Sequence, residues 1–104
     1  MTAPNTPLEA RLQQLAAWSL DAHRASIHKA WTFDSFDAAV LFFNRVAELA
    51  KAHDHHPEIV SCYTDLRVRL WTHEAGGLTD RDFALARAID QLERPNGGNR
   101  MGER

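Results

Sequence analysis

Histidines are the residues of this sequence whose types and spacing point most directly to chemistry. Four of its six histidines fall between positions 53 and 73, at His53, His55, His56 and His73. His55 and His56 are adjacent and precede Pro57, which favours an extended backbone at His56. The two imidazoles therefore point in different directions and can contact two parts of one flat ligand. Imidazoles with a pKa near ~6.5 exchange protons at neutral pH, so the cluster predicts general acid and base catalysis.

Other interpretations of these residues remain open from spacing alone. Clustered histidines can bind zinc, but the chain has no pair of histidines four positions apart. The H-x-H-H run also places ligands poorly for a tetrahedral site, so we expect no metal. Asp82 either caps a helix, as the third residue after Thr79, or orients a histidine by hydrogen bonding. His23 and His28 are isolated surface histidines to which we assign no role.

Three tryptophans and two arginines also admit two interpretations each. Trp18, Trp31 and Trp71 could stack on an aromatic ligand, although packing in a core or an interface is more common. Arg67 and Arg69 alternate with apolar residues and share one strand face with Trp71. That face must be solvated or meet a second copy of the chain, because it carries charged side chains.

The composition is that of one ordinary globular domain. The chain has 104 residues, 44% of them hydrophobic, and a formal net charge of -2. This balance excludes disorder over the whole chain and gives no general attraction to nucleic acid or to an anionic membrane. The single cysteine, Cys62, excludes an internal disulfide and suits a reducing cytoplasm. The sequence contains neither a recognisable signal peptide at residues 1–7 nor an apolar run of membrane-spanning length.

Periodicity predicts three helices and four strands in the order α-β-β-α-β-β-α. Apolar residues at helical spacing predict helices over residues 6–18, 35–54 and 79–94, the last two ended by Pro57 and Pro95. Alternation predicts two hairpins, over residues 18–22 with 27–33 and over 58–63 with 66–72, the second joined at Thr64 and Asp65. The simplest packing is an α+β fold in which helices cover one face of a four-stranded antiparallel sheet. We expect one domain over residues 1–94 and a disordered tail over 95–104.

The segment from Ala47 to Glu58, with its continuation to Asp82, resembles the signature of the pterin-4a-carbinolamine dehydratases. That signature has an acidic, Lys or His residue four positions before a His-His-Pro run, then an aromatic residue, another histidine and an aspartate. Its positions are filled here by Lys51, His55, His56, Pro57, Tyr63, His73 and Asp82. Further matches extend the resemblance to about residues 12–93, at Trp18, Ile27, Phe33, Phe36 and Ala39, with Trp31 where phenylalanine is usual.

The resemblance implies a reaction and a set of roles. The reaction is the loss of water from 4a-hydroxytetrahydropterin to give quinonoid dihydropterin, without metal or organic cofactor. His55 and His73 are then expected to serve as acid and base, in an order that the sequence leaves open. His56 is expected to hold the pterin and assist, and Asp82 to orient the site. The remaining residues expected to bind or orient the substrate are Asp54, Pro57 and Trp18.

The resemblance also implies partners. We expect a homodimer or homotetramer that recycles the tetrahydrobiopterin-type cofactor of aromatic amino-acid hydroxylases in the cytoplasm, without direct binding to nucleic acid or membrane. The alternative is a non-catalytic protein on the same fold. An animal relative is a dimerisation cofactor of a homeodomain transcription factor, and some bacterial relatives resemble assembly factors of the carbon-fixing carboxylase. A complete histidine set favours the enzyme, because a purely structural role has no need of it.

Overall fold

The computed structural model describes residues 7–96, with side chains described for residues 8–92. Their elements, in chain order, are α1 (Pro7–Gln13), β1 (Ser19–Leu20), β2 (Ile27–Thr32), α2 (Phe36–His53), β3 (Glu58–Cys62), β4 (Asp65–Leu70), the 3-10 helix η1 (His73–Ala75) and α3 (Asp80–Asn96). The predicted order of helices and strands is confirmed. Within the described range, no helix has the length and apolarity needed to cross a membrane.

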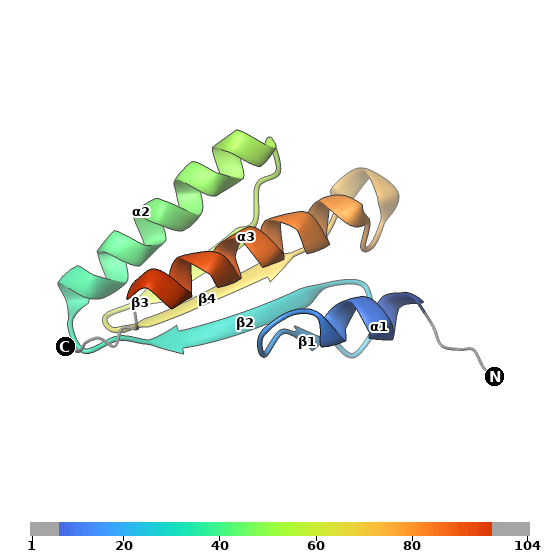
Figure 1. The fold of residues 1–104 in the computed structure, drawn as a ribbon. Helices are drawn as coiled ribbons and strands as arrows, with labels where there is room; N and C mark the ends of the chain where they lie inside the picture. The colour runs from blue at the N-terminus through green and yellow to red at the C-terminus, as the bar shows by residue number, and fades with distance from the viewer. Residues whose placement is uncertain (1–6, 97–104) are drawn as a thin grey trace.

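The four strands form one antiparallel sheet in the order β1-β2-β4-β3. Helices α2 and α3 lie side by side on one face of this sheet (Figure 1). In β4 the buried residues Leu66, Val68 and Leu70 alternate with exposed Arg67 and Arg69, as a sheet with one covered face requires. The predicted α+β fold with helices on one face is therefore confirmed.

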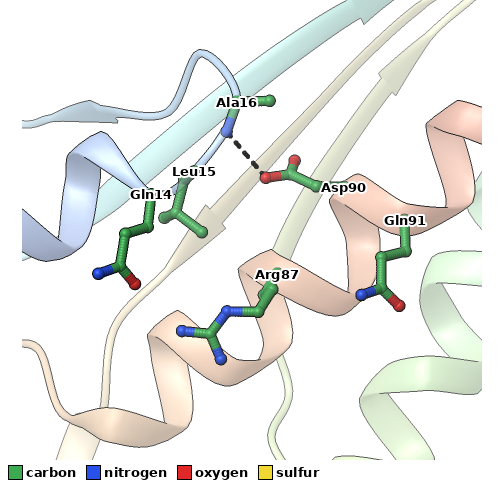
Figure 2. A pocket seen from close by; sticks show the side chains of 6 residues that line it. All are labelled: Gln14, Leu15, Ala16, Arg87, Asp90 and Gln91. Atoms are coloured by element: carbon green, nitrogen blue, oxygen red, sulfur yellow. Dashed lines mark hydrogen bonds between the residues drawn. The ribbon is translucent and has the colours of Figure 1, made fainter.

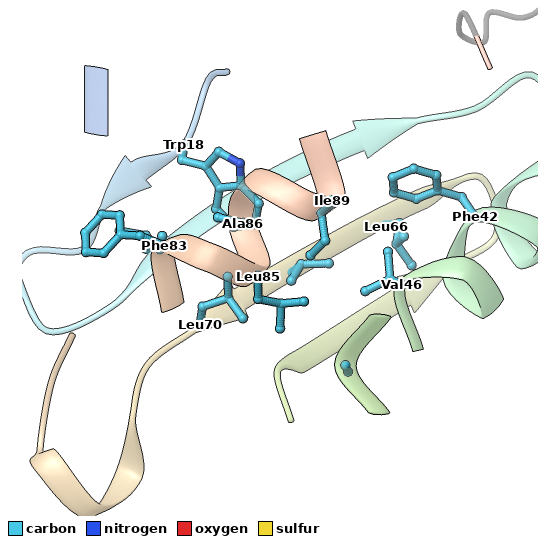
Figure 3. Close-up of a cluster of buried hydrophobic side chains, with 12 residues drawn as sticks. Trp18, Phe42, Val46, Leu66, Leu70, Phe83, Leu85, Ala86 and Ile89 are labelled. Carbon is cyan, nitrogen blue, oxygen red and sulfur yellow. The ribbon is translucent and has the colours of Figure 1, made fainter. Parts of the chain in front are cut away.

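The hydrophobic core lies between the sheet and the two long helices. Helix α2 contributes Ala39, Phe42, Val46 and Ala50, whose spacing of three or four residues places them on one side of the helix. Figure 3 shows Phe42 and Val46 of α2 close to Leu66 of β4, and α3 side chains such as Ile89 packed into the same cluster. This packing fixes both ends of α2 against the sheet, including the end that carries the histidines.

The first helix is shorter than its sequence pattern predicts. Helix α1 ends at Gln13, whereas the pattern predicts an end near Trp18. The buried carboxylate of Asp90 accounts for the difference, because it accepts hydrogen bonds from the Ala16 backbone N–H and from the Trp18 indole. Figure 2 shows Asp90 on α3 directed at the Ala16 nitrogen. These two bonds turn the chain into β1 instead of continuing the helix, and the proposed cap Thr6 lies outside the described residues.

Three other boundaries differ from the predictions. The second hairpin turns at Tyr63 and Thr64, one residue earlier than expected, and Tyr63 adopts a left-handed conformation there. Strand β4 ends at Leu70, so His73 lies beyond the strand, in η1. Helix α3 continues to Asn96 and includes Pro95, which was expected to end it. The predicted disorder of residues 97–104 falls outside the described part of the chain.

Helix α2 ends in a Schellman motif that places His55. Asp54 has φ 51° and ψ 45°, and its N–H donates to the Lys51 carbonyl. The next N–H, that of His55, donates back to the Ala50 carbonyl at 3.0 Å. These are the two bonds of a left-handed helix end. The helix therefore stops three residues before Pro57, and its last turn directs His55 back toward the core.

We expect Asp54→Gly to stabilise the protein. A residue with a Cβ in the left-handed region carries strain that glycine avoids, so the free energy of unfolding should rise by about 0.5–1 kcal/mol. Urea unfolding measures this change. Asp54→Ala is the control, because it also removes the carboxylate but keeps the Cβ. A glycine variant no more stable than the alanine variant would contradict the assignment of strain to Asp54.

Candidate active site

His55 and Asp82 form a buried pair between the end of α2 and the first turn of α3. The Nε2 atom of His55 lies 2.5 Å from the Asp82 Oδ1 atom. Their side chains are only 8% and 0% exposed. Because a carboxylate can only accept, Nε2 carries the proton and Nδ1 is the nitrogen left to exchange a proton with a ligand. The pair is therefore an imidazole oriented by a carboxylate, an arrangement also found in catalytic triads.

Asp82 also fixes the segment that leads to His73. Its Oδ2 atom accepts hydrogen bonds from the Thr72 hydroxyl at 2.8 Å and from the Thr79 backbone N–H at 2.9 Å. The second bond is that of a capping box at the start of α3. Both interpretations of Asp82 from the sequence thus describe this one carboxylate: it caps a helix with one oxygen and holds His55 with the other.

His73 is presented to solvent because its neighbour is anchored in the core. Thr72 is buried and extended, with its hydroxyl on Asp82 and its N–H donating to the Gly77 carbonyl at 2.8 Å. On either side of Thr72, Trp71 is half-buried and His73, the first residue of η1, is exposed. Both line a pocket of about 440 Å³. The Asp82 carboxylate thus binds His55 directly. Through the Thr72 hydroxyl it also holds the backbone that precedes His73.

The structure places the other expected residues around this centre in different ways. His56 is exposed and Pro57 half-buried, in the short connection between α2 and β3. The Asp54 carboxylate is exposed, and its backbone carbonyl accepts a hydrogen bond from Arg81 of α3. Arg81 therefore holds the end of α2 against the start of α3, next to the His55–Asp82 pair.

Trp18, which was expected to bind or orient the substrate, is buried in the core and hydrogen-bonded to Asp90. It is 6% exposed within the hydrophobic core, and its indole N–H donates to Asp90 at 2.8 Å. Its ring meets Trp31 edge to face, with centroids 6.1 Å apart. A buried ring with its polar atom already bonded cannot reach a ligand in solvent. Of the three tryptophans, Trp71 is the one that lines the pocket with His73.

In the described part of the chain, no group of three or more His, Cys, Asp or Glu side chains is arranged to hold a metal ion. Thr79 was named with Asp82 as a capping pair, but Thr72 was not expected to bind Asp82, since a hydroxyl residue ten positions before a carboxylate forms no recognised pattern. Asp21 and His23 also line the His73 pocket. No sequence signal indicated this, because the register of the β1–β2 hairpin brings them there.

The fold and the site define an α+β protein in which one carboxylate binds a buried histidine and, through Thr72, the backbone that precedes a solvent-exposed histidine. The chain belongs to the pterin 4 alpha carbinolamine dehydratase family, whose model matches residues 2–92. The resemblance inferred from the His-His-Pro segment is therefore confirmed.

Relatives and solved structures agree with this assignment. A protein of Acidobacterium capsulatum, named provisionally as a pterin-4-alpha-carbinolamine dehydratase, is 47% identical over 82% of this chain and 90% of its own length. Pterin-4-alpha-carbinolamine dehydratase 2, mitochondrial, of Arabidopsis thaliana is 38% identical over 79% of this chain and 46% of its own. A crystal structure from Brucella melitensis, described as a transcriptional coactivator/pterin dehydratase, matches with a TM-score of 0.80 and 28% identity, over 88% of this chain and 98% of its own.

Proposed function

We propose that the protein is a 4a-hydroxytetrahydropterin dehydratase that works by histidine acid and base catalysis. The observation that carries the proposal is the arrangement at Asp82: one carboxylate orients His55 and, through Thr72, fixes the backbone that presents His73. Two imidazoles attached to one rigid centre suit a reaction that moves two protons. Family membership supports the pterin substrate.

The reaction removes a hydroxyl group from C4a and a proton from N5. An imidazolium protonates the hydroxyl as the C4a–O bond breaks, and a neutral imidazole takes the N5 proton. The N5 electron pair then forms the C4a=N5 bond of the quinonoid dihydropterin, and water leaves. We assign the two proton transfers to His55 and His73, each contributing about 10²–10⁴-fold to the rate. His56 is assigned to hold the pterin, because it is exposed and next to His55.

A direct assay tests the activity. We expect the purified protein to accelerate conversion of chemically prepared 4a-hydroxytetrahydropterin above its spontaneous rate, followed by the absorbance of the quinonoid product.

The rival function is that of an assembly factor. A pterin dehydratase-like protein described as a RuBisCO assembly factor of the alpha-carboxysome matches with a TM-score of 0.65 but 20% identity, which shows the shared fold alone. Folded protein that leaves the spontaneous rate unchanged would favour the assembly-factor function.

We further propose a homo-oligomer that recycles tetrahydropterin for aromatic amino-acid hydroxylases in the cytoplasm. The first turns of α2 expose Phe36 (52%), Val40 (37%) and Leu41 (53%), three apolar side chains close together on one helix. Contiguous exposed apolar surface marks sites of protein association. A chain of this size also gains burial by associating with a second copy.

The oligomer proposal predicts a mass change in a single variant. Sedimentation of the wild type at micromolar concentration should give at least twice the monomer mass of 11.8 kDa. Leu41→Glu should move the protein toward the monomer, because a charge would have to be buried in the interface. Arg67→Glu changes the uncovered sheet face in the same way. Comparing the two variants shows whether α2 or the sheet face forms the interface. Dissociation by the Arg67 change and none by the Leu41 change would reject α2 as the interface.

A further inference from the structure

The pocket beside His73 has a second wall that the proposed proton transfers do not use. Asp21, His23 and Ser26, from the turn between β1 and β2, line a space of about 440 Å³ together with Arg69, Trp71 and His73. A volume of this size falls in the range of small-molecule sites. Figure 1 shows the β1–β2 connection at the same end of the sheet as the loop that leads from β4 into α3. The turn thus adds polar groups beside one of the two proposed catalytic histidines.

Asp21 is held in place and negatively charged at neutral pH. Its Oδ1 atom accepts hydrogen bonds from the backbone N–H groups of Ala25, at 2.8 Å, and Ser26, at 3.3 Å. The hydrogen bond from the Ala25 N–H lowers the pKa of the Asp21 carboxyl below its ordinary value. Asp21 is therefore ionised at neutral pH. It presents a fixed hydrogen-bond acceptor on the turn.

The positive charge of Arg69, which also lines the pocket, is already paired with a carboxylate. The Arg69 guanidinium lies 3.5 Å from the Glu58 carboxylate, donates to the Ser26 hydroxyl at 3.2 Å, and stacks over Trp71 with 5.2 Å to the ring centroid. Arg69 thus stiffens the wall, and Glu58 offsets its charge. The pocket combines a carboxylate, two imidazoles and an aromatic ring, which suits a neutral hydroxylated group, and the fixed charge of Asp21 disfavours an anionic one.

We propose that this pocket holds the substituent on C6 of the pterin, and that Asp21 and His23 select a neutral, hydroxylated chain. The inference rests on the proposed function. In a pterin, C6 is bonded to N5, and N5 is bonded to C4a. A histidine that exchanges a proton at N5 or at the C4a hydroxyl therefore lies next to the start of the C6 substituent. Since His73 is such a histidine and lines this pocket, the substituent enters the space between His73 and the β1–β2 turn.

Binding of three stable oxidised pterins tests the inference without requiring turnover. Biopterin carries a dihydroxypropyl chain on C6, 6-methylpterin a methyl group and pterin-6-carboxylate an anion. We expect the wild type to bind biopterin tightest and pterin-6-carboxylate weakest, measured by titration calorimetry. Asp21→Asn keeps an oxygen for the Ala25 N–H but removes the charge. It should weaken biopterin binding about 3–10-fold, strengthen pterin-6-carboxylate binding by a similar factor, and leave 6-methylpterin unchanged.

Two further variants complete the design. His23→Ala should weaken biopterin binding alone, and Asp37→Asn, which removes an exposed carboxylate from the first turn of α2, should change none of the three affinities. Equal binding of the three pterins by the wild type, or no change of preference in Asp21→Asn, would overturn the inference and leave the dehydratase proposal standing. Failure of folded wild type to bind any pterin would instead overturn the dehydratase proposal, and the inference with it.

Discussion

We expect His73→Ala to lower the rate of dehydration by about 10²–10⁴-fold while the protein remains folded. The loss is large because the change removes a proton-transfer group from the transition state. Folding is spared because the His73 side chain is exposed and its backbone is held by Thr72, which the variant retains. Stopped-flow turnover, with thermal melting of the same sample, separates lost chemistry from unfolding.

His55→Ala should cause a comparable loss of turnover together with some loss of stability, since it also removes one of the hydrogen-bond partners of the buried Asp82. If the two histidines act as a unit, the double variant should cost less in free energy than the sum of the single variants. His53→Ala is the matched control, because it removes an exposed histidine from the last turn of α2. Near-normal turnover by folded His55→Ala and His73→Ala would refute the assignment.

Asp90→Ala has the largest expected effect on stability. The Asp90 carboxylate accepts from Lys29 at 3.1 Å, from the Trp18 indole at 2.8 Å and from the Ala16 N–H at 2.9 Å. The Lys29 and Asp90 side chains are 6% and 7% exposed, so the alanine variant leaves a buried ammonium without this counter-charge. Breaking a buried pair from one side costs about 3–5 kcal/mol.

Urea unfolding measures this loss, and Asp37→Ala, which removes an exposed helix carboxylate, should change stability by less than about 1 kcal/mol. The fraction of Asp90→Ala that remains folded should keep its turnover, because Asp90 lies outside the histidine site. An Asp90→Ala variant within about 1 kcal/mol of the wild type would show that this network contributes little to stability.

The fold could be predicted from local patterns, because the sequence of each long element has the periodicity of its own secondary structure. Helix α2 has a run of buried positions at helical spacing and a Ser35 cap whose hydroxyl accepts from Ala38. Strand β4 alternates buried and exposed residues along its whole length. The end of α1 could not be predicted in this way, since it depends on hydrogen bonds to Asp90, a residue 74 positions away from Ala16.

The site was predictable as a set of residues but not as an arrangement. The His-His-Pro segment and Asp82 could be named from spacing, yet spacing does not show that His55 enters the core while His56 stays exposed. That difference arises from the left-handed Asp54, which turns the chain at the end of α2. The buried position of Trp18 could not be predicted for a related reason, because Asp90, which accepts from its indole, forms no motif with it.

The measurement that tests the central claim most directly is the dehydration rate of protein stripped of metal with a chelator. We expect metal-stripped wild type to convert 4a-hydroxytetrahydropterin as fast as untreated protein, and the His55→Ala, His73→Ala double variant to approach the spontaneous rate. A rate lost with the chelator and restored by zinc, or no acceleration by folded wild type, would contradict a dehydratase that works through two histidines organised by Asp82.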